Sequence, residues 1–150
     1  MTVCAALALG LLAVAMPSAD AVPRGRCNHP VVVTTLEFGP SIVAPGGTST
    51  VRLSGRNCSR SPQQVTVTWT ASFTGDTTGC PVIDPLPPRT LTIARGQGLR
   101  DHQTYTVPAA CAADTLKATA RVTDKTGKRI STKSAALRIR HKHPTGGGGY

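Results

Sequence analysis

The side chains best suited to do chemistry in this chain are its cations. The chain has 150 residues, with 17 lysines and arginines against seven acids, and a formal net charge of +10. Such a balance favours anionic partners, namely envelope polymers, phospholipid surfaces, nucleic acid or acidic glycans, although it also serves solubility alone. The cations that strand alternation and one turn place on a single face are Lys117, Arg121, Lys125, Lys128, Arg129, Arg138 and Arg140.

These cations would lie beside a row of hydroxyl groups. Thr66, Thr68, Thr70 and Ser72 alternate with apolar residues in the preceding part of the chain. A cationic surface next to hydroxyls binds phosphate- or carboxylate-bearing polymers by charge and hydrogen bonding. The alternative is an ordinary solvated sheet face, because antiparallel sheets commonly expose one side to water.

The cysteines are the second set of reactive side chains. Cys4 falls in an apolar N-terminal segment, which leaves Cys27, Cys58, Cys80 and Cys111. An even number in an exported chain indicates two disulfides, and four cysteines allow three pairings. None belongs to a Cys-x-x-Cys pair, so neither a zinc site nor thiol redox chemistry is expected.

Other reactive groups do not combine into a catalytic site. Asp101 and His102 adjoin, but no Gly-x-Ser-x-Gly turn is present to hold a nucleophile. His141 and His143 could bind copper or nickel only weakly, because Lys142 separates them. Aromatic residues are scarce, which disfavours stacking on single-stranded nucleic acid. We therefore expect no enzyme activity, no cofactor, no metal and no specific nucleic-acid partner.

The N-terminus predicts export. An apolar run over residues 5–16 ends at Pro17-Ser18, and Ala19-Asp20-Ala21 provides small residues for cleavage, so residues 1–21 read as a signal peptide. The run is shorter than the ~20 apolar residues of a spanning helix, and no later stretch is long enough. We expect a secreted or extracellular protein, with association to the cell surface as an option.

The elements that must position these residues are β-strands. Alternation is clearest over Gln64–Phe73, where the single Trp69 stands in the apolar row and can anchor a core. Turn signals about every ten residues predict an all-β, seven-stranded antiparallel sandwich over residues 22–140, followed by a flexible, basic and glycine-rich tail, 141–150. The predicted strands are 30–38, 49–55, 64–73, 90–94, 102–107, 116–123 and 131–139.

One segment carries a resemblance. The stretch Val43-Ala44-Pro45-Gly46-Gly47-Thr48-Ser49-Thr50-Val51-Arg52-Leu53 resembles the start of immunoglobulin-like and fibronectin-type modules of secreted bacterial proteins. The resemblance implies an immunoglobulin-like sandwich and a role in extracellular binding or spacing. In such a sandwich Cys27 and Cys58 lie at one end, while Cys80 and Cys111 lie at the other. The resemblance therefore favours the pairs Cys27–Cys58 and Cys80–Cys111.

These inferences predict a secreted, non-catalytic binding or surface-associated module. Its basic face would contact an anionic cell-envelope polymer or another secreted protein. Two alternatives stay open at this point. One is a secreted inhibitor or small-ligand carrier that uses the proline-rich loop Gly75–Pro88, and the other is a structural spacer without a ligand.

Overall fold

The computed structural model describes residues 27–141 as an all-β protein. The predicted signal peptide at 1–21 and the tail from residue 142 onward lie outside these residues. Within the described part, no helix is long and apolar enough to cross a membrane. The strands are β1 (Val31–Gly39), β2 (Ile42–Val43), β3 (Thr48–Asn57), β4 (Gln63–Thr74), β5 (Arg89–Ile93), β6 (Gly98–Thr106), β7 (Thr115–Asp124) and β8 (Arg129–Ile139).

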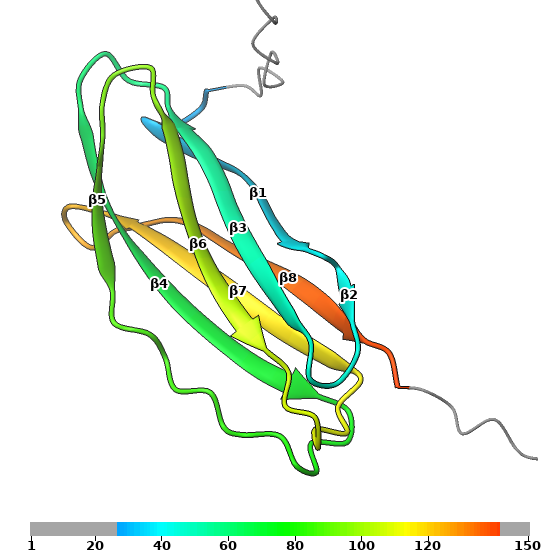
Figure 1. Ribbon diagram of the computed structural model, residues 1–150. Helices are drawn as coiled ribbons and strands as arrows, with labels where there is room; N and C mark the ends of the chain where they lie inside the picture. The colour runs from blue at the N-terminus through cyan, green and yellow to red at the C-terminus, as the bar shows by residue number, and fades with distance from the viewer. Residues whose placement is uncertain (1–26, 142–150) are drawn as a thin grey trace, which may run out of the picture.

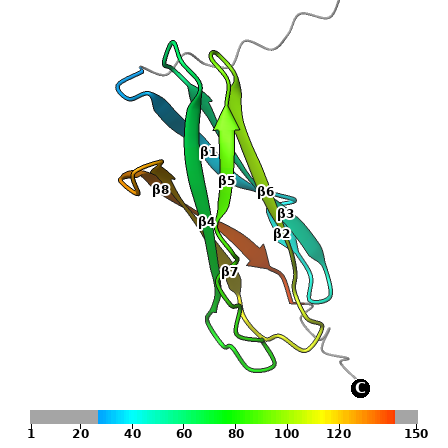
Figure 2. The same ribbon diagram turned by 90° about the vertical axis from the view of Figure 1, so that its left-hand side faces the viewer.

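The strands form two sheets that enclose one core (Figure 1). One sheet has the order β1-β3-β6 and the other has the order β2-β8-β7-β4-β5. All pairs are antiparallel except β2 with β8, which is parallel. In the view of Figure 2, β5 lies between β4 and β6, so the short β5–β6 turn connects the two sheets along this side.

The core follows from the period-2 alternation of the strands. On β4, Val65, Val67 and Trp69 are buried, with 1% or less of their surface exposed, while the threonines between them lie on the outer face. The opposite sheet contributes the fully buried Val51 and Leu53. The prediction that β4 presents its apolar row inward is confirmed.

Two details of the predicted strands are wrong. The described residues contain eight strands rather than seven, because Ile42–Val43 pairs with the end of β8 in parallel. The strand expected to begin at His102 begins instead at Gly98. Asp101 interrupts the apolar alternation there, and the sequence offered no reason to place a carboxylate inside the sandwich.

Two side chains accommodate that buried carboxylate. Asp101 Oδ2 accepts a hydrogen bond of 2.8 Å from the indole Nε1 of Trp69, and Oδ1 accepts one of 2.8 Å from Arg89 Nη1. Asp101 comes from β6 and its two partners come from the facing sheet, so this triad joins the sheets across the core. A buried charge is tolerated only when it is paired and hydrogen-bonded.

The position of Asp101 also protects an edge. Strand β6 is an outer strand of its sheet, and such edges tend to pair with other chains. Inward-pointing charges on edge strands are one of the features by which native proteins oppose such pairing.

Disulfides close both ends of the sandwich. Cys27 bonds to Cys58 and Cys80 bonds to Cys111, which is the pairing that the sequence favoured. Each spans a sequence separation of 31 residues, which corresponds to about 3–4 kcal/mol in the loop-entropy model. Two disulfides in one small domain indicate an oxidising, extracellular type of environment.

The Asp101 triad leads to a stability prediction. We expect Asp101→Ala to lower the free energy of unfolding by about 2–4 kcal/mol, because it leaves the buried indole N–H without an acceptor and removes the partner of Arg89. Asp101→Asn should cost less, since its amide oxygen still accepts one bond. Urea unfolding followed by Trp69 fluorescence measures both variants.

The neighbouring Arg100 provides the matched control, because it lies on the same strand but is exposed. Arg100→Ala should change stability by less than about 0.5 kcal/mol. An Asp101→Ala protein as stable as this control would show that the triad does not hold the sheets together.

Candidate cationic face

The outer face of the five-stranded sheet consists of hydroxyls and cations along its two central strands. The outward residues of β4 from residue 66 onward are Thr66, Thr68, Thr70, Ser72 and Thr74, and those of β7 are Thr115, Lys117, Thr119, Arg121 and Thr123. The register places them directly opposite one another, with Thr68 facing Arg121 and Ser72 facing Lys117. The two central strands therefore present no carboxylate on this face.

Three of the predicted cations lie together on this face. Lys117 and Arg121 are exposed on β7, and Arg138 is exposed on the adjacent β8. Arg138 pairs with Thr115, which places it diagonally next to Lys117 across strands about 5 Å apart. Arg121 lies four residues further along β7, about 13 Å from Lys117. Arg140 follows Arg138 beyond the end of β8 and is also exposed.

The other three predicted cations lie at the far end of β7. Lys125, Lys128 and Arg129 are exposed in and after the β7–β8 turn. Ten residues of β7 separate this turn from the start of the strand, a span of about 30 Å. The seven cations thus form a band along β7 and β8, which we call the cationic band, rather than one compact patch.

Two acids lie near the cationic band: Asp114 lines a shallow pocket with Arg138 and Arg140, and Asp124 ends β7 at the turn. Asp124 accepts hydrogen bonds from the Thr126 hydroxyl at 2.6 Å and from the Lys128 backbone N–H at 3.0 Å. The Thr126 hydroxyl is the main cause that lowers the pKa of Asp124, and the nearby Lys128 charge contributes. Asp124 therefore places one negative charge next to Lys128 at this end of the cationic band.

The cations of the band carry no ion pair within the described residues. Among residues 27–141 the only salt bridge joins Arg89 to Asp101, away from this face. Several hydroxyls bond to each other, as Thr119 does with Ser134 at 2.8 Å. Thr68, Thr70 and Ser72 make no such side-chain bond within that range. The face therefore offers exposed charges and donors to a ligand.

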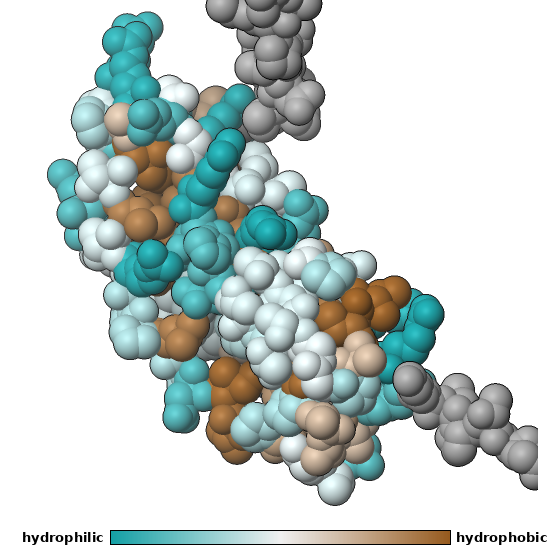
Figure 3. Space-filling model, in the orientation of Figure 1, coloured by the Kyte–Doolittle hydropathy of each residue, from teal (hydrophilic) through white to brown (hydrophobic). Residues whose placement is uncertain are grey.

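A second cationic surface escaped the sequence analysis. On the outer face of the three-stranded sheet, Arg52 stands opposite His102 and Ser54 stands opposite Arg100. These residues line a shallow cavity of about 610 Å³, and hydrophilic side chains gather over β3 and β6 in Figure 3. The alternation of Arg100, Asp101 and His102 could have indicated this surface. It was not used, because the strand was predicted to begin only at His102.

The remaining candidate residues serve other roles. Asp101 faces the core and the adjacent His102 faces solvent, so the two do not form a catalytic pair. Asn57, which heads an Asn-x-Ser glycosylation sequence, is buried, and its Nδ2 donates to the carbonyls of Ser61 and Ile93. A glycan has no access to that nitrogen.

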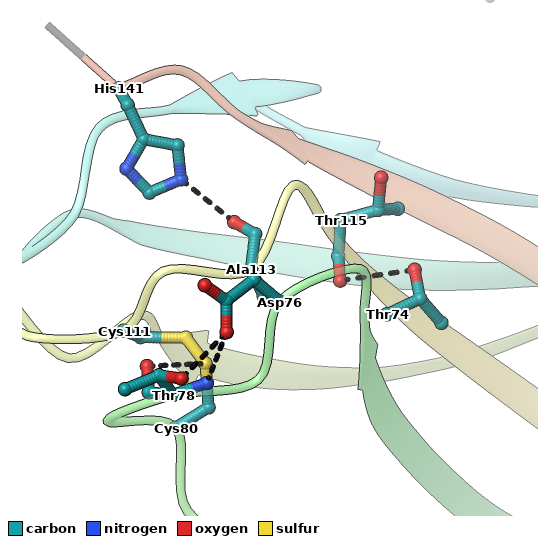
Figure 4. The surroundings of a disulfide bond; sticks show 8 residues. All are labelled: Thr74, Asp76, Thr78, Cys80, Cys111, Ala113, Thr115 and His141. Atoms are coloured by element: carbon teal, nitrogen blue, oxygen red, sulfur yellow. Dashed lines mark hydrogen bonds between the residues drawn. A yellow bond between two sulfur atoms is a disulfide. The ribbon is translucent and has the colours of Figure 1, made fainter.

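Metal-ligating side chains are dispersed in the described part of the chain. No three histidine, cysteine, aspartate or glutamate residues between 27 and 141 lie close enough together to hold a metal ion. His141 Nε2 lies 3.0 Å from the carbonyl oxygen of Ala113 (Figure 4). Its predicted companions Lys142 and His143 lie outside the described residues.

Comparisons with known proteins identify no family. No protein-family model and no curated protein matches the chain. A solved structure of the alkylpurine DNA glycosylase AlkC of Pseudomonas fluorescens, bound to DNA with an abasic-site analogue, is similar in fold, with 14% sequence identity and a TM-score of 0.53. The match covers 76% of this chain and 31% of that one, so this chain spans about a third of its length.

A second similar structure is a cycloisomaltooligosaccharide glucanotransferase of a Paenibacillus species in complex with cycloisomaltoheptaose. It shares 21% identity with a TM-score of 0.47, and the match covers 69% of this chain and 13% of that one. At these identities the first likeness concerns the fold alone.

The hydrogen bonds around Asp124 lead to a pH prediction. Its folded-state pKa lies below the ordinary value of 3.8, so the ionised carboxylate stabilises the turn above the unfolded-state pKa. This contribution is lost as the pH falls through the folded-state pKa. We expect an NMR titration to place the pKa of Asp124 below 3.8 and Thr126→Val to move it back upward.

Thr92→Val is the matched control, because Thr92 is an exposed threonine on β5 with no bond to Asp124. An Asp124 pKa that is insensitive to Thr126→Val would contradict the role of the hydroxyl.

Proposed function

We propose that this chain is a secreted, non-catalytic, immunoglobulin-like β-sandwich module that binds anionic cell-envelope polymers through its cationic band. One observation carries the proposal. The outer faces of β4 from Thr66 onward and of β7 present hydroxyls and cations, and the exposed Lys117, Arg121 and Arg138 form no salt bridge among residues 27–141. A solvated sheet face of ordinary composition would carry both signs of charge.

The arrangement of the strands supports the immunoglobulin-like part of the proposal. Strands β1, β3 and β6 face a sheet that contains β8, β7 and β4 in this order, as the two sheets of such domains do. Strand β5 pairs with β4 rather than with β6, which is the place of the extra strand in variable-type domains. Cross-linking by two disulfides and a core centred on Trp69 suit a small exported domain.

The length of the cationic band supports a linear polymer rather than a compact anion. Cations spaced over about 30 Å can engage successive phosphates or carboxylates along an extended chain. The hydroxyls of Thr68 and Ser72, which stand opposite Arg121 and Lys117, supply donors between the charges. Each exposed contact is weak, so affinity would arise from several contacts made at once.

Binding of this kind must depend on ionic strength. We expect the oxidised chain to be retained at 50 mM NaCl on beads that carry poly(glycerol phosphate) or polygalacturonate, and to be released at 500 mM NaCl, because the charges are solvent-exposed and screened. The double variant Lys117→Glu/Arg121→Glu should bind the better of the two polymers at least about tenfold more weakly, which corresponds to about 1.4 kcal/mol.

A matched control changes the net charge equally at another place. Arg60 and Arg95 are exposed in loops at the end of the sandwich that carries Cys27 and Cys58, so Arg60→Glu/Arg95→Glu should weaken binding far less. Equal losses in both double variants would mean that net charge alone drives retention. Absence of retention at low salt on both polymers would overturn the proposal and leave a spacer without a ligand.

A further inference from the structure

The long β4–β5 connection, Gly75–Pro88, is held rigidly at its start. Asp76 accepts hydrogen bonds from the hydroxyl and the backbone N–H of Thr78, and Ala112 donates its N–H to the Thr78 carbonyl. Gly79 packs so closely on the carbonyl of Ala110 that a side chain there would collide with it. The Cys80–Cys111 disulfide then fixes the connection to the loop that precedes β7 (Figure 4).

The connection is held again further along. The N–H of Leu86 donates to the carbonyl of Trp69 at 3.2 Å, which continues the β5 pairing with β4 by one further bond. Ile83 and Leu86 pack against the hydrophobic core. Between the two anchors, an open cavity of about 300 Å³ separates the connection from the end of β4, and Phe73, Val82 and Ile83 are among the residues that line it.

The segment between the two anchors, residues 81–85, which we call the arch, carries one highly exposed apolar side chain. Val82 is 92% exposed, whereas the only other exposed large hydrophobic residue among residues 27–141, Ile42, is 39% exposed. Figure 3 shows hydrophobic side chains at the lower end of the molecule, where Figure 1 draws the connection. Pro81 and Pro85 flank the exposed valine and restrict the backbone on both sides.

This combination suits a binding segment, because an exposed apolar side chain can enter an apolar pocket of a partner and leave water. A segment that is already ordered loses little conformational entropy when it binds, so rigid anchoring on both sides of one exposed side chain favours affinity. Protease–inhibitor complexes form in this way, with little movement of either backbone.

We propose that Cys80–Pro85 is an inhibitory loop that occupies the active-site cleft of a serine protease whose S1 pocket accepts a small aliphatic side chain. Val82 enters that pocket, and the bond presented to the nucleophile is Val82–Ile83. Serine proteases choose the residue before the cleaved bond by the shape of S1, and the elastase type has a small pocket there.

The two anchors explain why the bond would resist cleavage. Hydrolysis adds one water, which leaves a carboxylate on Val82 and an amine on Ile83. The disulfide at Cys80 keeps the carboxylate in place, and the half-buried side chain of Ile83 with the Leu86–Trp69 bond keeps the amine in place. The new ends therefore stay within reach, which favours re-formation of the peptide bond over release of product.

This inference is independent of the cationic band, because the loop lies beside the outer edge of β4, whereas the band runs along β7 and β8. The two functions therefore respond differently to salt. Polymer binding by exposed charges is lost at 500 mM NaCl, whereas insertion of an apolar side chain into a pocket is not weakened by salt.

The test titrates pancreatic elastase with the oxidised chain at 500 mM NaCl and follows a chromogenic peptide substrate. We expect stoichiometric, competitive inhibition with the Val82–Ile83 bond intact by mass spectrometry. Val82→Lys should lose at least about a hundredfold in affinity for elastase and gain inhibition of trypsin, because a buried charge matches only the S1 pocket of trypsin. This variant changes a side chain that is almost fully exposed, so its fold is preserved.

Two further variants separate the loop from the rest of the surface. Ile42→Lys makes the same exchange at the other exposed aliphatic residue and should leave elastase inhibition unchanged. Cys80→Ala/Cys111→Ala releases one anchor and should turn the chain into a substrate that is cut after Val82.

Three outcomes would overturn the inference. The first is that the chain does not inhibit elastase and Val82→Lys does not inhibit trypsin. The second is rapid cleavage of the oxidised chain at Val82–Ile83. The third is elastase inhibition that survives Val82→Lys, because a different surface would then be responsible.

Discussion

The fold depends on how Trp69 is buried. Its ring fills the space between the two sheets, and burial of an indole without a partner for its N–H would be costly. Asp101 supplies that partner from the facing sheet, and Arg89 neutralises the carboxylate from β5. Arg89 is half exposed, with 51% of its side chain accessible, whereas 3% of the Asp101 side chain is accessible. The charge pair therefore sits at the margin of the core, where its desolvation is limited.

That triad also sets what the chain can display. Because the face of β4 that carries Trp69 packs on the core, the threonines of β4 must point outward. The register aligns them with Lys117 and Arg121 on β7. The pairing of β5 with β4 ends at Val67, apart from one further bond from Leu86 to Trp69, and the chain between Cys80 and Leu86 runs beside the end of β4 without pairing with it. The cationic band and the proposed inhibitory loop are thus consequences of the same strand placement on two different parts of the surface.

Strand alternation made most of the architecture predictable. The rows on β4 and β7 could be assigned to inner and outer faces because each step of one residue reverses the side-chain direction. The positions of the cysteines, placed in the immunoglobulin-like sandwich that the resemblance implied, favoured the disulfide pairing that the structure has. The prediction failed where alternation was broken by a buried charge, at Asp101, and where a strand had only two residues, at Ile42–Val43.

The sequence by itself determined the all-β class, the two disulfides and the cations that face away from the core, because these follow from local periodicity and from spacing along the chain. Only the tertiary structure decided that β5 pairs with β4, that the seven cations extend in a band, and that Arg52, Arg100 and His102 meet on the second sheet. It also decided that Val82 stands alone at the outside of a doubly anchored arch. These features depend on contacts between residues far apart in sequence, which no local pattern encodes.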